Sequence, residues 1–295
     1  SYVRKATLDG LPVIVGCGVY LADAPVAKPD VKKISAGELM ELVRDAATLL
    51  AQKGEAAYPE FRKIGSRWLH DETYFFVWDM DGKRVFHAAN PGGEGQYMRE
   101  IKDVLGRPWG RMFLEAAASP AGEGWVHYLY PEPGDIFPTW KSSFIKKVIF
   151  PDGKEYLVGC GIYQMKMEKP FIQDVVDNAV RLIESKGDDA FADFHDKTGS
   201  FIFLDTYVFV DSPEGVEIVN AAQPSVEGKN LIALKDAKGE PAMRNYLKVA
   251  LEKGSGWVDY QWYRPGTNSP APKHTYVKKA VHAGKTYVVG AGFYD

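Results

Sequence analysis

"VGCGIY", residues 158–163, recurs almost letter for letter at two other places in the chain, and this repeat decides the fold. The other copies are VGCGVY at Val15–Tyr20 and VGAGFY at Val289–Tyr294, one residue before the end of the sequence. A motif in that position is expected to be the last strand of a folded unit. The first copy would then close a unit of only about twenty residues, which is too short for a domain of its own.

The similarity extends backwards from each later copy at a steady spacing. GWVDYQW (Gly256–Trp262) matches GWVHYLY (Gly124–Tyr130), and residues 191–228 align without gaps with residues 58–95. A spacing that holds along a whole unit indicates duplication rather than chance. We therefore expect two complete units of one fold.

The N-terminus carries only the end of this pattern, since Ser1–Tyr20 aligns with Ser143–Tyr163 alone. An Asp-Gly pair in the middle of each of these segments predicts a tight hairpin turn. We divide the chain into the C-terminal hairpin of an incomplete unit (1–22), a first complete unit (30–165) and a second complete unit (170–295).

Within a complete unit the predicted order is one helix followed by strands. Ser35 and Glu38 form a capping-box pattern ahead of apolar residues at helical spacing, and Pro170 opens the equivalent helix of the second unit. YFFVWD (Tyr74–Asp79) and later apolar runs predict strands, interrupted by a polar, partly helical stretch at 91–118. This order predicts an α+β fold of two tandem PAS-like units, each with a long N-terminal helix and a roughly five-stranded antiparallel sheet.

Composition and missing motifs argue against several classes of function. The formal net charge is −3 and the positive residues are scattered, so we expect no nucleic-acid partner. No apolar run reaches the ~18 residues of a membrane span, so we expect no membrane insertion. The sequence holds no HExxH motif, no nucleophile elbow and no CxxC pair, which predicts no enzyme activity, no metal site and no cofactor. Cys17 and Cys160 fit small buried apolar positions.

The order and spacing of these motifs resemble type-2 Cache domains, the extracytoplasmic ligand-sensing modules of chemoreceptors and sensor kinases. The resembling stretches are Phe76–Gly95, Lys102–Gly106, Gly124–Pro131, Lys141–Lys147 and Val158–Tyr163, with their counterparts in the second unit. The resemblance implies a PAS-like fold with a pocket over one sheet face, often for short carboxylates or amino acids, and no catalysis. It also implies an extracytoplasmic location, either periplasmic or extracellular.

The first candidate for contact with a carboxylate ligand is Arg67, whose planar guanidinium can bind both oxygens. The neighbouring Trp68 would form an apolar wall. In related Cache pockets an arginine from the segment before the first strand encloses the ligand, and the resemblance places that role at Arg67. The alternative is an exposed arginine beside a core tryptophan.

Two lysines and a histidine also stand at family positions. Lys141 occupies a place where the family pattern has a lysine, and Lys273 keeps that place in the second unit. The alternative for Lys141 is a solvated lysine at a strand edge. His87 matches a further family position, although a lone histidine on a strand is more often a structural residue.

Aromatic residues complete the predicted site. Tyr128 and Tyr130 share one face of a predicted strand, where their hydroxyls would orient a carboxylate; core packing is the alternative. Gly159 and Gly161 are expected to let a neighbouring ring or backbone approach closely. The candidate ligand-binding residues are Arg67, Trp68, His87, Tyr128, Tyr130 and Lys141 in the first unit and Tyr260, Trp262 and Lys273 in the second.

These features predict a module that binds a small organic anion or amino acid and serves extracytoplasmic sensing in signal transduction or chemotaxis. The alternative is a structural extracellular repeat or filament-forming protein on a Cache scaffold. In that case the N-terminal hairpin would pair with another copy, and the protein would self-associate.

Overall fold

A computed structural model of the chain contains two compact units, Ser1–Lys33 and Ile34–Asp295, and each is described by itself. The described residues are 2–8, 11–17, 34–70, 72–267 and 269–295. The unit Ser1–Lys33 holds an antiparallel hairpin of β1 (Tyr2–Leu8) and β2 (Leu11–Cys17), as the sequence predicted. Residues 1, 9–10 and 18–22 of the predicted segment 1–22, which include the predicted Asp-Gly turn, lie outside the described residues. The origin of the hairpin in an incomplete unit stays a prediction.

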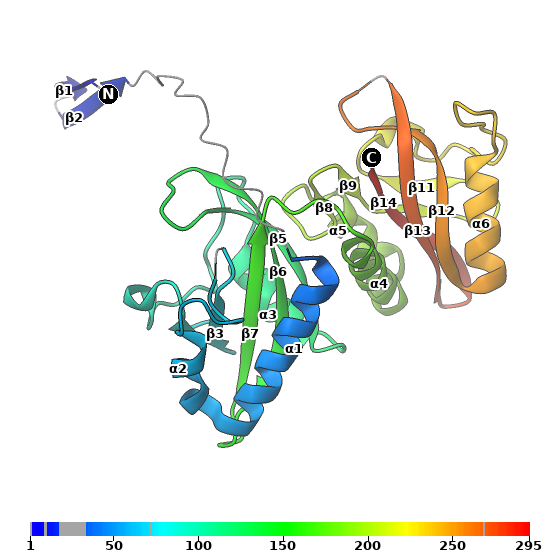
Figure 1. The fold of residues 1–295 in the computed structure, drawn as a ribbon. Helices are drawn as coiled ribbons and strands as arrows, with labels where there is room; N and C mark the ends of the chain where they lie inside the picture. Colours follow the sequence, from blue (N-terminus) through cyan, green and yellow to red (C-terminus); the bar gives the residue numbers. More distant parts are fainter. Residues whose placement is uncertain (1, 9–10, 18–33, 71, 268) are drawn as a thin grey trace. The chain divides into compact units, whose positions relative to one another are not determined.

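The unit Ile34–Asp295 contains two modules with the same order of main elements, a first module (Ala36–Tyr163) and a second module (Lys169–Tyr294) (Figure 1). The helices of the first module are α1 (Ala36–Lys53), η1 (Gly54–Ala57), α2 (Tyr58–Phe61), η2 (Pro91–Gly93) and α3 (Trp109–Ala118). Its strands are β3 (Phe75–Asp79), β4 (Arg84–His87), β5 (Glu123–Pro131), β6 (Pro138–Ile149) and β7 (Glu155–Tyr163). They form an antiparallel sheet in the order β4-β3-β7-β6-β5.

The second module repeats this plan and adds a two-stranded sheet. Its helices are α4 (Lys169–Lys186), η3 (Gly187–Ala190), α5 (Phe191–His195), η4 (Pro224–Val226) and α6 (Ala242–Lys253). Its strands are β8 (Ile202–Phe203), β9 (Thr206–Tyr207), β10 (Phe209–Asp211), β11 (Glu217–Asn220), β12 (Ser255–Tyr263), β13 (Pro270–His282) and β14 (Lys285–Tyr294). The main sheet runs β11-β10-β14-β13-β12 and β8 pairs with β9. The α+β prediction, with a long helix and a five-stranded antiparallel sheet in each module, is confirmed.

Each sheet packs against helices on both faces. Alternate residues of a strand point to opposite sides, so one strand contributes to both packing layers. Tyr207 and Phe209 pack in one hydrophobic cluster with α6, whereas Val208 and Val210 pack in another with α4. In the first module α1 and α3 take the places of α4 and α6 (Figure 1). The α3 and α6 faces are the ones that carry the pockets described below.

Local sequence signals account for the start of α1. The Ser35 hydroxyl accepts the Glu38 backbone N–H at 3.2 Å, and the Glu38 carboxylate accepts the Ser35 N–H at 2.8 Å. This is the predicted capping box, which satisfies two backbone donors at the helix start. The helix then buries an apolar stripe that includes Leu39, Val43 and Leu50.

The glycines of the repeated motif make room for side chains that cross β7. A Cβ added at Gly159 would lie 2.5 Å from the Phe76 ring. At Gly161 it would lie 2.2 Å from Ser143 Oγ and 2.8 Å from Lys141 Cε. The predicted close approach at both glycines is confirmed, and it explains why a strand signature contains Gly-x-Gly.

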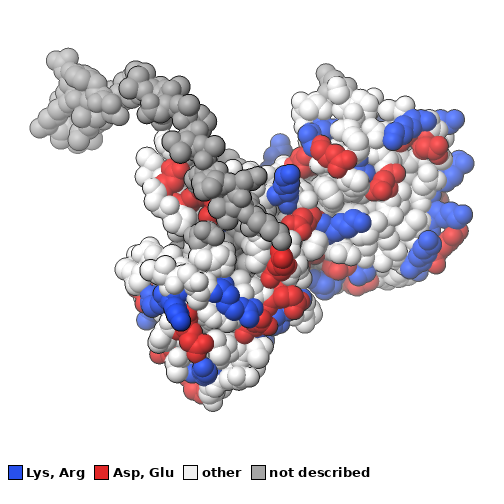
Figure 2. Space-filling model, viewed as in Figure 1, with Lys and Arg blue, Asp and Glu red and all other residues white. Residues whose placement is uncertain are grey.

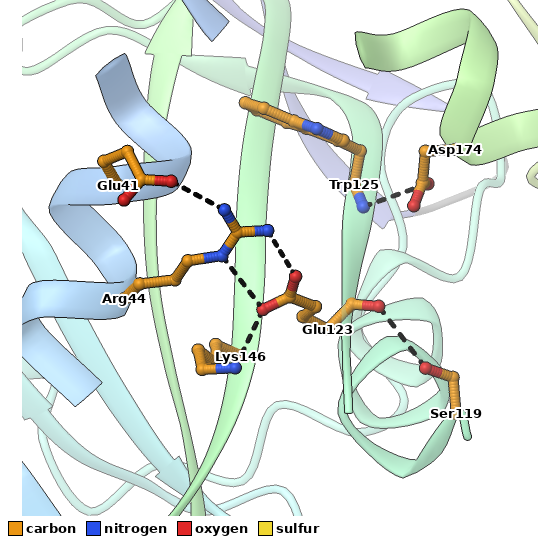
Figure 3. Close-up of polar contacts among 7 residues, drawn as sticks. All are labelled: Glu41, Arg44, Ser119, Glu123, Trp125, Lys146 and Asp174. Carbon is orange, nitrogen blue, oxygen red and sulfur yellow. Dashed lines mark hydrogen bonds and ion pairs between the residues drawn. The ribbon is translucent and has the colours of Figure 1, made fainter. Parts of the chain in front are cut away.

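The edge strand β5 contacts residues of the second module, among them Asp174, which bonds to Trp125 (Figure 3). The Trp125 N–H donates to the Asp174 carboxylate of α4 at 3.2 Å, and the His127 ring stacks on Phe203 at a centroid distance of 3.9 Å. Arg107, which precedes α3, donates to backbone carbonyls that include Gly199 O at 2.9 Å. The Trp125–Asp174 hydrogen bond satisfies a backbone donor that the edge strand otherwise leaves open.

The described surface carries charges of both signs. Figure 2 shows Lys, Arg, Asp and Glu interspersed on the face in view, in agreement with the scattered positive residues of the sequence. Within the described residues, no helix has both the length and the apolar character needed to cross a membrane. Cys160 is a free, fully buried thiol, as predicted, whereas the side chain of Cys17 lies outside the described residues.

Candidate ligand-binding pockets

The first module has a cavity between its sheet and α3. Its described lining residues are Tyr74, Phe76, Trp78, Arg84, His87, Trp109, Phe113, Tyr128, Tyr130 and Lys141. The cavity between them is small, about 20 Å³, which is roughly the space that one water molecule needs. Seven of these residues are Phe, Tyr or Trp, three are basic, and no acidic side chain is among the described residues of the lining.

Strand alternation builds this lining. Phe76 stacks on Phe113 of α3 at a centroid distance of 5.3 Å, and Trp78 packs against Trp109 at 5.8 Å. Phe75 points to the other face, where it contacts Phe61 of α2. The cavity therefore lies on the face opposite α1 and α2.

Lys141 is the most unusual residue of the cavity, because its side chain is a cation with only 1% of the residue exposed. Its Nζ donates to the hydroxyls of Tyr74 and Tyr163, and it lies 4.0 Å from the centre of the Tyr74 ring. Burial lowers the pKa of Lys141 to about 7. Within the described residues, no carboxylate forms an ion pair with Lys141.

Arg84 and His87 bring further nitrogen to the cavity wall. The Arg84 guanidinium is held by the Gly93 carbonyl, to which its Nε donates at 2.9 Å. His87 Nδ1 accepts the Asn90 N–H at 2.9 Å. Burial, with the positive charges of Arg84 and Lys141, lowers the pKa of His87 to about 3. The imidazole is therefore neutral and carries its proton on Nε2, which makes that atom a donor.

The two predicted tyrosines close the cavity from β5. Tyr128 is buried, its hydroxyl lies 3.0 Å from Ser143 Oγ, and its ring stacks on Trp109 at 4.8 Å. Tyr130 is half-buried, and the centre of its ring lies 5.5 Å from Lys141 Nζ. Both residues combine an apolar ring with a hydroxyl, which suits a ligand that is partly polar.

Arg67 and Trp68 lie elsewhere. Arg67 forms an ion pair with Asp45 of α1, and its side chain is 56% exposed. Trp68 packs edge-on against Phe61 and Phe75, on the α1 face of the sheet. The arrangement is the one stated as the alternative, an exposed arginine beside a packed tryptophan, and neither residue lines the cavity.

The second module has an equivalent cavity, also of about 20 Å³, between its sheet and α6. Its described lining residues are Tyr207, Phe209, Glu217, Asn220, Leu231, Leu234, Met243, Tyr246, Tyr260, Trp262 and Lys273. The predicted Tyr260, Trp262 and Lys273 all belong to it. Lys273 is 1% exposed and donates to the Tyr207 hydroxyl at 3.0 Å, and burial lowers its pKa to about 7.

Sequence comparison decides the family of these modules. A model of the Cache domain family matches residues 61–203 and, a second time, residues 196–294. This chain belongs to the Cache domain family. Its modules are type-2 Cache domains in tandem, and Cache domains are extracellular or periplasmic sensors rather than enzymes.

Individual relatives of this Cache protein are distant. Over 112 residues, 38% of this chain, it is 31% identical to the methyl-accepting chemotaxis protein McpP of Pseudomonas putida, and it spans 20% of that relative's length. A solved Cache chemosensory domain described for carboxylic acid recognition is 23% identical, with a TM-score of 0.36 over 42% of this chain and 90% of that one. The ligand-binding domain of the amino acid chemoreceptor PctB of Pseudomonas aeruginosa, solved with L-Arg, is 13% identical, with a TM-score of 0.31 over 88% and 86%.

Several lining residues of the Cache pockets were not predicted as site residues from the sequence. Tyr74, Phe76 and Trp78 share one face of a predicted strand, and the sequence favours core packing for them, since an aromatic residue on a buried face packs the same way with or without a cavity. Arg84 gave a clearer signal that was missed, because the ungapped alignment of the modules sets it against Glu217. A buried strand position that reverses its charge between duplicates points to a change of ligand or partner.

Proposed function

We propose that the first Cache module binds a small organic anion, a short carboxylate, and that the chain is the extracytoplasmic sensing part of a signal-transduction or chemotaxis protein. The observation that carries this proposal is Lys141, a buried lysine in an aromatic cavity. Among the described residues, no carboxylate forms an ion pair with it. Burying an unpaired charge is costly, and an anionic ligand would supply the missing partner.

The cavity offers complementary groups to both ends of such a ligand. A carboxylate near Lys141 can also accept from the Nε2–H of His87, under the positive field of Arg84. Phe76, Phe113 and Trp109 leave an apolar surface for the short remainder of the molecule.

The experiment is isothermal titration calorimetry of the chain with acetate, propionate, lactate and pyruvate. We expect Lys141→Met to weaken the binding of the best of these anions at least tenfold, because a hydrogen bond to a charged group contributes about 1.5–3 kcal/mol. The matched variant Lys273→Met changes the equivalent lysine of the other module and should leave that affinity within twofold. Equal affinity in wild type and Lys141→Met would refute the proposed site.

Arg67→Ala tests the site as first predicted from the sequence. Since Arg67 pairs with Asp45 outside the cavity, this variant should keep the anion affinity of the wild type. A loss of binding would show that Arg67 contributes to the anion site. Self-association stays a separate prediction, and size-exclusion chromatography at several protein concentrations tests it directly.

A further inference from the structure

The two pockets share a lysine but differ in charge at one pair of facing positions. In the first module Trp78 on β3 lies opposite Arg84 on β4. In the second module the corresponding cross-strand pair is Asp211 on β10 and Glu217 on β11. An aromatic residue and a cation are thus replaced by two carboxyl groups at the same place in the fold.

Both carboxyl groups are deeply buried. Asp211 is 0% exposed and Glu217 is 3% exposed. Asp211 Oδ2 accepts the Tyr246 hydroxyl at 2.8 Å, and Glu217 Oε1 accepts the Asn220 side-chain amide at 2.6 Å. The other oxygen of Asp211, Oδ1, is buried without an N–H donor in the described part of the chain, and the Asp211 and Glu217 carboxyl groups share a hydrogen bond when one of them is protonated.

The protein supplies little compensation for this pair. Burial, and then the charge of Glu217, raises the pKa of Asp211 well above its usual range, and burial raises that of Glu217 to about 7. Lys273, the one cation among the described lining residues, partly offsets this pair, since its charge lowers the pKa of Glu217, but it forms no direct ion pair with either carboxyl. Two buried acids side by side destabilise a fold unless a donor or a cation satisfies them.

The cavity provides access to the pair. Glu217 and Tyr246 line it, and Asp211 contacts both of them. We propose that the cavity of the second module binds a small molecule that carries a protonated amino group, with this group held by the Glu217 carboxylate beside the Asp211 carboxyl. The inference concerns a different cavity from the carboxylate site of the first module and does not depend on it.

Two kinds of ligand carry an ammonium group: simple amines, and zwitterions such as amino acids. A zwitterion would also place its carboxylate at Lys273, as the first module would place an anion at Lys141. A simple amine would gain nothing from that lysine. The effect of replacing Lys273 therefore distinguishes a simple amine from a zwitterion.

The test uses three probes of similar size, propionate, n-propylammonium and β-alanine, titrated calorimetrically into the full chain in an amine-free buffer at pH 7.5. We expect at least one of the two ammonium probes to bind, and Glu217→Gln to weaken it at least tenfold. The matched control Glu214→Gln changes an exposed glutamate of the same β-hairpin and should have no effect. Lys273→Met then identifies the source, since it should weaken β-alanine but not n-propylammonium.

Two results would overturn the proposal: neither ammonium probe binds, or the bound probe keeps its affinity in Glu217→Gln. Loss of propionate binding in Lys141→Met reports separately on the first module, so failure at one pocket is distinguished from failure at the other. Hydrogen exchange of the wild-type chain gives a measurement independent of any variant. Protection by the ammonium probe should fall on β10, β11 and α6, and protection confined to the first module would contradict the assignment.

Discussion

Lys141 makes the proposed anion site sensitive to pH near neutrality. Only the protonated amine attracts a carboxylate, and burial lowers its pKa to about 7 in the free protein. The His87 pKa of about 3 keeps that residue neutral throughout the same range. The titration of this lysine should therefore dominate the pH dependence of binding.

Affinity for the best-binding anion should be nearly constant from pH 6 to 7 and then fall by up to about tenfold per pH unit towards pH 9, because binding above the free pKa requires proton uptake. Calorimetry in two buffers of different ionisation enthalpy measures the proton taken up. The Lys273→Met variant should show the same profile. An affinity independent of pH over this range would exclude Lys141 as the anion-binding group.

Among single residues, the sequence predicted the location of strand residues better than the location of Arg67. Lys141, Lys273 and Tyr128 lie on strands, where alternation fixes the face of each side chain, and all of them line the pockets. Arg67 precedes the first strand, in a segment without periodicity, and its direction depends on Asp45 of a distant helix. No sequence rule gives that direction, and the resemblance to relatives placed the arginine in the pocket instead.

Among the elements, the Gly-x-Gly end of β7 does more than form a strand. Gly161 gives space to Lys141 Cε, so the strand backbone fixes where the ammonium group lies. Gly292 of β14 does the same for Lys273, since a Cβ there would lie 2.9 Å from its Cε. The capping box and the strands were predictable from local patterns, whereas this role required knowing which side chain crosses the glycine.

Gly161→Ala should therefore affect both stability and binding. We expect the free energy of unfolding to fall by about 1–3 kcal/mol, as for other overpacked core positions, and the anion affinity to fall at least tenfold as Lys141 moves. Chemical denaturation and calorimetry measure the two effects. Gly292→Ala should destabilise the chain similarly but leave the anion affinity unchanged. If both variants bind like the wild type, the glycine does not position the lysine.

On the scale of the whole unit Ile34–Asp295, the contact between its modules was the least predictable feature. Asp174 and Trp125 lie far apart in the sequence, and nothing in the local pattern of α4 indicates that a carboxylate will accept the N–H of an edge strand (Figure 3). Burial at this junction raises the pKa of Asp174 to about 7. The junction thus contains a group that loses its proton near neutral pH.

The sign of the resulting pH effect follows from the raised pKa. The stabilising contribution of protonated Asp174 is complete below the ordinary pKa of 3.8 and is lost as pH rises through about 7. Asp174→Asn keeps the side-chain acceptor for Trp125 and removes the charge. Relative to the wild type, this variant should gain about 2 kcal/mol of unfolding free energy at pH 8, discounted because Asp174 is only half-buried, and almost nothing at pH 4. Denaturant unfolding of both proteins at the two pH values measures this difference; an equal difference at pH 4 and pH 8 would show that the Asp174 carboxyl does not titrate within the folded junction.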